Sequence, residues 1–341
     1  MLAPVKIGNL TIDIPVCLAP MAGTSTVVYR RICHEYGAGF CPTELSSARS
    51  VRFSGIDKGF RYMRIDPEGE GVTAIQLFGN DPDDLDYAVR AICEDDRLKD
   101  VSIIDINMGC PVPKVVKTGA GSALIKTPEL AGECVAAAVR AAAVYGKPVT
   151  VKTRTGFDLP GESAELIRAA ADAGAAMICI HGRTRKQLYS GQADWDSIAS
   201  LGKIASDRGV PVFANGDIKD SASAQKVIEQ TGCAGIMVGR AAMGNPWLFA
   251  SLANELCGSS YDDHTPSQEE RVEMIMRHLT ESCEVIREEV AVKEFRSVLP
   301  QYIKGRRGAA QIRARLMSAS TVAEVEEILR KTIDGQGGGQ D

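Results

Sequence analysis

The chain lacks the cysteine spacing of a metal site or a disulfide framework. None of its ten cysteines forms a C-x-x-C pair, so the spacing argues against zinc and we expect no bound metal. Several cysteines lie in apolar stretches, where a free thiol acts as a small hydrophobic side chain. We therefore expect reduced cysteines and a cytoplasmic protein.

Four other signals are also absent. The first nine residues do not show the pattern of a signal peptide, and no apolar run approaches the roughly 18 residues of a membrane helix, so we expect no membrane contact. The formal net charge is −5, so any surface for nucleic acid must be local. The pattern G-x-G-x-x-G after a strand is missing, so a dinucleotide would have to bind without that fingerprint.

The apolar residues that are present form a repeating pattern. The length of 341 residues suits an eightfold β/α barrel of about 250 residues and one small domain. Eight short apolar runs cover residues 16–20, 39–43, 72–78, 101–107, 149–153, 177–181, 210–215 and 235–239. Amphipathic stretches of helix length lie between most of them. Apolar strands that alternate with helices predict a parallel sheet, and eight of them predict a closed TIM (β/α)8 barrel.

The helical stretches are clearest at 82–93, 128–145, 163–173 and 221–230, whereas 46–70 is polar and lacks a clear helix period. After Trp247 the pattern becomes purely helical, with periodic stretches at 268–287 and 322–331. We predict a catalytic barrel over residues 1–250, a small all-helical C-terminal domain over 255–335, and a flexible tail over 336–341.

Polar residues follow most of the predicted strands, and in a barrel all these ends lie at the rim where active sites are built. The last two strands end in Asn215, Gly216 and Asp217 and in Gly239 and Arg240. Backbone N–H groups at such turns bind phosphate, and glycine allows a close approach. We predict a phosphate site there, with Arg240 adding charge; the alternative is a pair of ordinary turns.

Four further rim residues carry chemistry. Lys152 is suited to the electron-rich edge of a flavin, His181 to donation to a phosphate or a substrate carbonyl, and Gln76 to orienting the same ring. Taken singly, a solvated lysine or a structural histidine is the alternative. Cys110 stands in a loop after the fourth strand, where a thiol serves as a nucleophile or a proton donor; the alternative is a buried, inert cysteine. The sequence places no base beside it.

Positive charge gathers in the C-terminal part. Between residues 293 and 315 the only acidic residue is Glu294. The basic residues there are Lys293, Arg296, Lys304, Arg306, Arg307, Arg313 and Arg315, and the rim adds Arg183, Arg185 and Lys186. Such a patch on an acidic chain suits a phosphate backbone, whereas a solvated helix face is the alternative.

Taken together and in this order, the motifs resemble those of the tRNA-dihydrouridine synthases, most closely the bacterial B-type branch. The matching stretches are APMAG (19–23), QLFG (76–79), DINMGCP (105–111), GAGSAL (119–124), PVTVKTR (148–154), HGRT (181–184), GQADW (191–195), NGD (215–217), GR (239–240) and NPW (245–247). The resemblance covers the chain from about residue 4 to about residue 329.

The resemblance implies an FMN-binding barrel followed by a helical domain that binds tRNA. It implies that NADPH supplies the electrons and that the C5–C6 double bond of specific uridines is reduced to 5,6-dihydrouridine. Hydride would pass from flavin N5 to C6, and Cys110 would give the proton to C5. Because the dinucleotide fingerprint is missing, NADPH is expected to use the same open flavin face, and we expect a monomer.

The resemblance also implies roles for individual residues. Against the flavin ring would lie the backbone of Pro20, Met21 and Ala22. At its polar edge would stand Gln76 and Lys152, with His181 near the flavin and the target base. Around the phosphate would lie Asn215, Gly216, Asp217, Gly239 and Arg240. Facing the uracil would be Asn107, Arg183 and Arg154.

Two other interpretations remain open at this point. An FMN-barrel oxidoreductase acting on a small pyrimidine or an enoate would keep the same rim but would not need the basic helical domain. A non-catalytic RNA-binding protein could keep the barrel as a scaffold. The presence of Cys110, Lys152 and His181 argues against the second of these.

Overall fold

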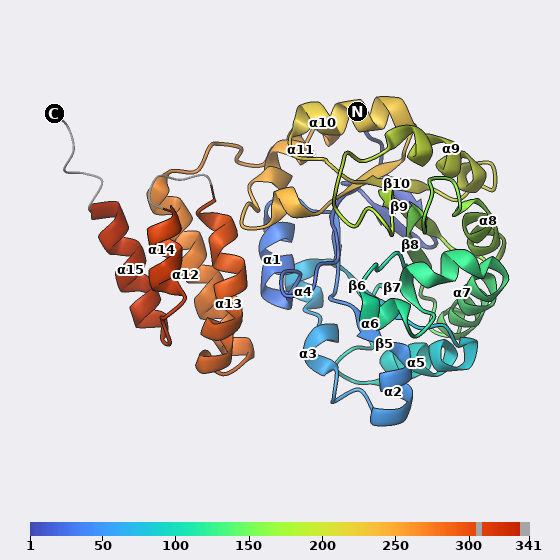
Figure 1. Ribbon diagram of the computed structural model, residues 1–341, viewed down its shortest axis with the longest axis horizontal. Helices are drawn as coiled ribbons and strands as arrows, with labels where there is room; N and C mark the ends of the chain where they lie inside the picture. The colour runs from blue at the N-terminus through green and yellow to red at the C-terminus, as the bar shows by residue number, and fades with distance from the viewer. Residues whose placement is uncertain (305–308, 335–341) are drawn as a thin grey trace.

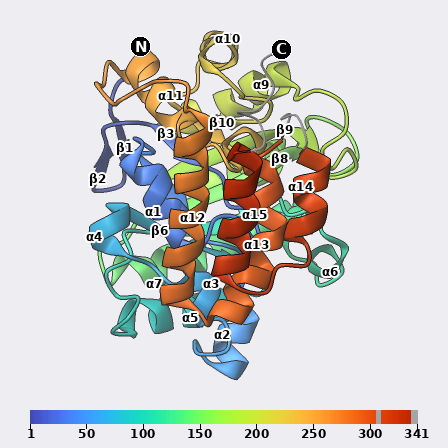
Figure 2. The same cartoon turned by 90° about the vertical axis from the view of Figure 1, so that its left-hand side faces the viewer.

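The computed structural model describes residues 1–304 and 309–334 of the chain (Figures 1 and 2). Two short strands, β1 (Val5–Ile7) and β2 (Leu10–Ile12), form an antiparallel hairpin before the barrel. Their buried side chains share a cluster with Phe40 and Phe213, which stand at the amino ends of barrel strands. The hairpin therefore covers that end of the barrel, opposite the rim that carries the polar residues.

Eight parallel strands form the barrel, in the order β3-β11-β10-β9-β8-β7-β6-β4. They are β3 (Val16–Leu18), β4 (Phe40–Pro42), β6 (Val72–Phe78), β7 (Ile103–Met108), β8 (Val149–Gly156), β9 (Met177–Thr184), β10 (Val212–Asn215) and β11 (Gly235–Val238). A backbone hydrogen bond of 2.8 Å from Gly39 N–H to the Val16 carbonyl links the two ends of this order. Every predicted strand is present, and the predicted TIM barrel is confirmed.

Helices surround the strands, as Figure 1 shows. They are α1 (Val27–Glu35), α5 (Pro82–Glu94), α7 (Pro128–Ala143), α8 (Ala164–Asp172), α9 (Trp195–Ser206), α10 (Ser221–Thr231) and α11 (Leu248–Cys257). Aspartates at 81, 194 and 220 cap three of them by accepting backbone N–H bonds, which is the preferred chemistry for a helix start.

The stretch 46–70, which lacked a helix period, contains β5 (Ser46–Ser47), which pairs with β6, and three short helices. These are α2 (Ala48–Ser54), α3 (Phe60–Met63) and α4 (Pro67–Glu70). Elements of four to seven residues are too short to show an amphipathic period. The loop after β7 likewise contains α6 (Pro113–Val116) and the 3-10 turn η1 (Gly121–Lys126), and η2 (Arg240–Ala242) follows β11.

After the segment 258–267, helices are the only regular elements in the described residues of the C-terminal part. It contains α12 (Gln268–Val285), α13 (Glu288–Tyr302), α14 (Ala309–Leu316) and α15 (Val322–Asp334), which stand beside α1 and α3 in Figures 1 and 2. The predicted boundary after residue 250 falls within α11, which packs against α10 and β3. Arg306, Arg307 and the predicted tail lie outside the described residues.

Aromatic side chains join the C-terminal helices to the barrel. The ring of His278 on α12 stacks on Tyr29 of α1 at 5.1 Å, and its Nδ1 lies 3.0 Å from the hydroxyl of Tyr302 on α13. Tyr29 in turn donates to the carbonyl of Ala242. Gly244 approaches α13 so closely that a Cβ there would lie 2.5 Å from the Tyr302 nitrogen. The helices are thereby fixed against the segment that follows β11.

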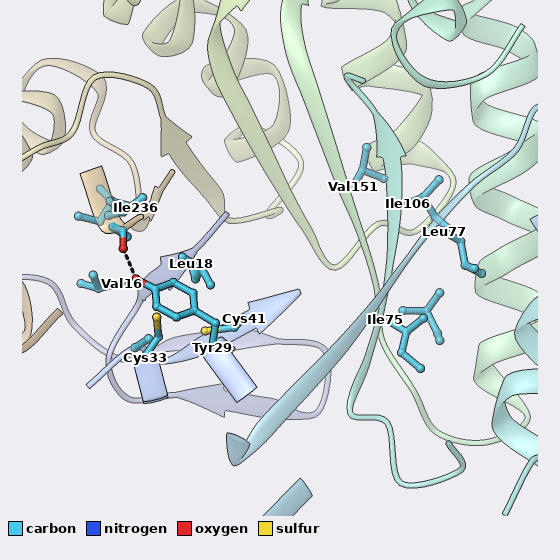
Figure 3. Close-up of a cluster of buried hydrophobic side chains, with 14 of the residues drawn as sticks. Val16, Leu18, Tyr29, Cys33, Cys41, Ile75, Leu77, Ile106, Val151 and Ile236 are labelled. Atoms are coloured by element: carbon cyan, nitrogen blue, oxygen red, sulfur yellow. Dashed lines mark hydrogen bonds between the residues drawn. The ribbon is translucent and has the colours of Figure 1, made fainter. Parts of the chain in front are cut away.

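The core agrees with the expected role of the cysteines as small hydrophobic side chains. All ten are free, and Cys33 of α1 and Cys41 of β4 are buried among Val16, Leu18 and Tyr29 (Figure 3). Burial raises the pKa of the Cys41 thiol to about 12, so this side chain stays uncharged and serves as a small hydrophobic group.

Candidate functional site

The parallel register brings the predicted rim residues side by side. Asn107 on β7 pairs with Lys152 on β8, and Arg154 pairs with His181 on β9. His181 is in turn opposite Asn215 on β10. Residues separated by more than 100 positions in the chain therefore share one edge of the barrel, as the strand pattern predicts.

A chain of buried hydrogen bonds runs across β6, β7 and β8. Asp105 accepts from the Thr150 hydroxyl and from Gln76 Nε2, both at 2.6 Å, and Asn107 Nδ2 donates to Gln76 Oε1 at 3.0 Å. Burial raises the pKa of the Asp105 carboxyl, and the two donors oppose that shift. This network sets the orientation of the Gln76 amide.

Asp105 was not among the predicted site residues. It belongs to the DINMGCP stretch, and a carboxylate in the middle of an apolar strand is the signal that sequence reasoning missed. Through Gln76 it also fixes Asn107, whose Oδ1 accepts from the backbone N–H of Cys110 at 2.8 Å. Both ends of the Asn107 side chain therefore have partners within the protein, and its predicted contact with uracil stays a prediction.

Cys110 lies half-buried in the loop after β7. Its carbonyl accepts from Ser122 Oγ at 2.9 Å and from Ser122 N–H at 3.1 Å. A Cβ on Gly121, which has φ +62°, would lie 2.9 Å from the same carbonyl, so glycine is needed for this close packing. Burial raises the pKa of the Cys110 thiol, against the opposing effects of the Val112 N–H, Arg154 and Lys152. The thiol is therefore protonated at neutral pH.

Lys152 donates from Nζ to Asn215 Oδ1 at 2.9 Å, and Asn215 Nδ2 donates to the Met237 carbonyl at 2.6 Å. Burial lowers the pKa of Lys152. The Asn215 side chain thus orients the lysine, which leaves two of the three ammonium donors for a ligand.

His181 is buried beside this pair. Burial lowers its pKa well below the usual value, and the positive charges of Lys152, Arg154 and Arg183 lower it further. The imidazole is therefore neutral at pH 7, with one nitrogen that donates and one that accepts. Within residues 1–304 and 309–334 neither ring nitrogen has a protein hydrogen-bond partner, so both are free for a ligand.

Asp217 binds two arginines. Arg183 Nη2 lies 2.9 and 2.8 Å from its two oxygens, and Arg240 Nη2 lies 3.1 Å from one of them. Arg183 is 1% exposed, and it also donates to the carbonyl of Gly191 at 2.6 Å. It was predicted to face uracil; its buried Nη1, which has no partner within the described parts of the chain, is the donor that remains for that role.

The turns after β10 and β11 present unpaired backbone N–H groups. Asp217 has φ +55° and Gly216 has φ +123°, conformations that L side chains rarely adopt. No acceptor within the described chain binds the N–H of Gly216, Asp217, Gly239 or Arg240. Because the two arginines neutralise the Asp217 carboxylate, the turns offer donors without a repelling charge. These features fit a phosphate group.

Arg154 and an exposed tyrosine stand at the mouth of the site. Arg154 is buried and donates to the carbonyls of Gly109, Thr184 and Leu188 at 2.8–2.9 Å. Its guanidinium lies 5.8 Å from the ring of Tyr189, and that of Arg240 lies 5.0 Å away. Tyr189 is 55% exposed and was missed by sequence reasoning, although it is the aromatic residue between the HGRT and GQADW motifs.

The loop after β3 completes the rim. Pro20 and Met21 are half-buried and Ala22 is exposed. The Met21 sulfur lies 3.9 Å from where a Cβ on Gly239 would stand, so the first and eighth strands present their loops to each other.

Two features are absent from the part of the chain that the structure describes. Residues 1–304 and 309–334 contain no group of three or more His, Cys, Asp or Glu side chains that could hold a metal ion. None of the helices in the same ranges is both long and apolar enough to cross a bilayer.

A closed parallel barrel with its polar side chains gathered at the carboxyl ends of the strands defines a TIM-barrel enzyme. Comparison with known proteins gives the particular family. Residues 17–336 match the protein-family model described as "Dihydrouridine synthase (Dus)". The chain therefore belongs to the dihydrouridine synthase family, and the predicted family is confirmed.

Individual relatives support the same family assignment. The chain is 37% identical over 333 residues to a "Probable tRNA-dihydrouridine synthase" of Treponema pallidum, covering 96% of this chain and 95% of the relative. It is 37% identical over 311 residues to "tRNA-dihydrouridine synthase B" of Pseudomonas aeruginosa, covering 91% and 90%. Among solved structures, a 2-naphthoyl-CoA reductase complex is similar with a TM-score of 0.57 at 10% identity, covering 74% of this chain and 52% of that one. That likeness concerns the fold.

Proposed function

We propose that this enzyme binds FMN and uses NADPH to reduce specific uridines of tRNA to 5,6-dihydrouridine. The observation that carries the proposal is the position of a protonated thiol, Cys110, on the same rim as Lys152, His181 and the unpaired N–H groups after β10 and β11. The names of the relatives support tRNA as the substrate.

The residues present fit FMN. The N–H groups of Gly216, Asp217, Gly239 and Arg240 would hold its phosphate. Lys152, which Asn215 orients, would stand at the ring edge where negative charge develops. When bound, FMN would supply the hydride that adds to C6 of uracil.

The protein would supply the other groups. Cys110 would give its proton to C5 of the uracil, and its raised pKa keeps that proton in place until it is needed. The neutral His181 would donate to a uracil carbonyl. Because a uridine must leave its stack to reach the rim, an exposed aromatic such as Tyr189 would replace part of the lost stacking.

RNA would meet the chain where the barrel joins the C-terminal helices. A pocket of about 450 Å³ there is lined by Arg240, Arg271 and Lys304, together with Gln301 and Tyr302. The pocket adjoins the rim, since Arg240 also binds Asp217. Lys293, Arg313 and Arg315 of the basic segment are exposed, whereas Arg296 donates to the Ala319 carbonyl at 2.7 Å. We propose that the pocket receives a phosphate of the RNA backbone.

Substitution Lys304→Gln is expected to weaken tRNA binding and to reduce the slope of log Kd against log salt by about 0.7–0.9, the value for one lost phosphate contact. The matched control is Lys203→Gln on α9, which is exposed and pairs with Asp207 at 2.8 Å. Electrophoretic or fluorescence titrations at several salt concentrations would measure the Kd and the salt slope for both variants. An unchanged slope for Lys304→Gln would show that no RNA phosphate binds there.

The proposed function as a whole is tested on the purified wild-type protein. A flavin absorption spectrum is expected, and incubation with unmodified tRNA and NADPH is expected to give dihydrouridine, detected by mass spectrometry of the digested RNA. A flavin spectrum without dihydrouridine would move the assignment to a small pyrimidine or enoate substrate. A protein that cannot take up FMN would disprove the proposal.

A further inference from the structure

The loop from residue 19 to residue 26, which joins β3 to α1, is held from within along its second half. Ser25 N–H donates to the Met21 carbonyl at 2.9 Å, and the Ser25 hydroxyl accepts from Met21 N–H at 3.0 Å. Arg30 Nη1 donates to the Ser25 carbonyl at 2.7 Å. Met21 and Ser25 therefore keep their positions without help from a ligand.

The middle of the loop has a different support. Ala22 and Gly23 are exposed, and Gly23 has φ +70°. Gly23 N–H donates to Glu44 Oε1 at 2.6 Å, a short bond of the kind made to a charged acceptor. This is the hydrogen bond that joins residues 22–23 to the rest of the described chain. A hydrogen bond of 3.0 Å from Thr24 N–H to the Met21 carbonyl closes the turn itself, and the Glu44 carboxylate ties that turn to the barrel.

Glu44 is an unusual residue to find in this place. It follows β4 and is 8% exposed, so its carboxylate gives up most of its hydration. A buried charge is costly unless it makes specific contacts. Within the described residues the Gly23 N–H is the one hydrogen-bond donor to this carboxylate, which indicates that the residue serves to make this bond.

The backbone beside Glu44 reaches a second part of the rim. The Thr43 hydroxyl donates to the Glu44 carbonyl at 3.0 Å and accepts from the Gln76 N–H at 3.0 Å. Residues 43–44 therefore join the loop after β3 to Gln76 on β6. Both ends of this link are predicted to touch the same cofactor ring.

We propose that Glu44 is a positioning residue for the cofactor, whose carboxylate holds Gly23 and so keeps the loop of residues 20–23 in the conformation that receives the flavin ring. The inference rests on the proposed function, because it takes the ligand of the rim to be FMN. Glu44 itself would not touch the ring; it acts through the backbone of the loop.

The charges around Glu44 allow a pH test. Arg30, Arg61 and Glu294 face it, and Arg61 also pairs with Glu294 at 2.5 Å. Burial raises the pKa of Glu44, while the Gly23 N–H and the two arginines oppose that shift. As pH falls through this raised pKa, the carboxylate gains a proton and the charged bond to Gly23 is lost. FMN affinity is therefore expected to fall on the acid side, at a higher pH than for an ordinary glutamate.

The experiment measures the Kd of FMN for the flavin-free full-length protein by fluorescence quenching. Glu44→Ala is expected to weaken binding about 10- to 100-fold, the effect of losing one hydrogen bond to a charged group. Glu44→Gln keeps an acceptor oxygen in place and is expected to recover most of the affinity while losing the acid-side fall. Glu294→Gln is the matched control, because it removes a neighbouring carboxylate that does not bind the loop.

The outcomes separate this inference from the proposed function. A wild-type protein that binds no FMN contradicts the proposed function. If the wild type binds FMN and the Kd of Glu44→Ala lies within twofold of the wild-type Kd, the role of Glu44 is overturned and the proposed function stands. If Glu44→Ala does not fold, the Glu44→Gln pH profile decides: an acid-side fall like that of the wild type overturns the inference, and its loss supports it.

Discussion

Replacing Cys110 with alanine is expected to lower the rate of dihydrouridine formation by about 10²–10⁴-fold, the usual contribution of a positioned proton donor. In the proposed mechanism Cys110 gives the proton to C5 of the uracil, and Asn107 and Ser122 hold its loop in place. Single-turnover measurements with reduced protein and unmodified tRNA would isolate this step. FMN binding is expected to be unchanged, since the thiol is not part of the proposed phosphate site.

Two comparisons make this result specific. Cys257→Ala removes a partly exposed thiol on α11 and is expected to leave the rate unchanged. Cys110→Ser keeps the size of the side chain but replaces a thiol by a hydroxyl that holds its proton far more tightly, so its rate is expected to stay low. A Cys110→Ala protein with more than a tenth of the wild-type rate would show that the proton comes from another group.

The pH dependence of the reaction rate follows from the proposed role of Cys110 as the proton donor. The proposed mechanism needs the protonated thiol of Cys110, and burial raises the pKa of that thiol. The wild-type rate is therefore expected to persist at pH values where an ordinary thiol has ionised, and to fall only as pH rises through the raised pKa. A fall that begins near neutral pH would contradict this environment for Cys110.

The second large effect concerns stability. Glu70→Ala is expected to reduce the free energy of unfolding by about 3–5 kcal/mol, the cost of leaving the partner of a buried ion pair uncompensated. Arg30 and Glu70 are 1% and 2% exposed and form two bonds, of 2.5 and 2.9 Å. Arg30 also donates to the carbonyls of Ser25 and Arg64, both at 2.7 Å, so its guanidinium cannot turn to water. Denaturant unfolding followed by circular dichroism would measure the change.

Two further variants serve as controls for this result, one in a surface ion pair and one that removes both charges of the buried pair. Glu165→Ala removes an exposed partner of Arg168, three residues away on α8, and is expected to change stability by less than about 1 kcal/mol. The double substitution Arg30→Met with Glu70→Leu removes both charges and is expected to recover part of the loss. A Glu70→Ala protein as stable as Glu165→Ala would mean that Arg30 finds another way to be solvated.

The local patterns of the chain predicted much of the fold. Each barrel strand is a short apolar run, such as residues 72–78, and each is recognisable from its own composition. The predicted rim followed from one rule, that the carboxyl ends of parallel strands meet at one edge. For that reason the strand pattern alone places Asn107, Lys152, His181 and Asn215 together, and the register of the sheet agrees.

The patterns failed where elements are short or where a residue's role depends on a distant partner. The helices in 46–70 have too few residues to show a period. Asp105 carried a local signal, its position in an apolar strand, but its partners Gln76 and Thr150 are distant in the chain. Nothing near Glu44 in the chain shows that it will be buried. Arg183 stood in a recognisable motif, but its pairing with Asp217, 34 residues away, could not be read from it.

The sequence by itself determined the barrel, the family and most of the residues at the rim, since these depend on periodicity and on short motifs that each segment carries alone. The tertiary structure decided which atoms of those residues pair and which stay available. It decided that Asn215 holds Lys152, that two arginines neutralise Asp217, and that Gly244 packs against α13. These outcomes depend on the distances between segments far apart in the chain, and such distances are set only when the whole core packs.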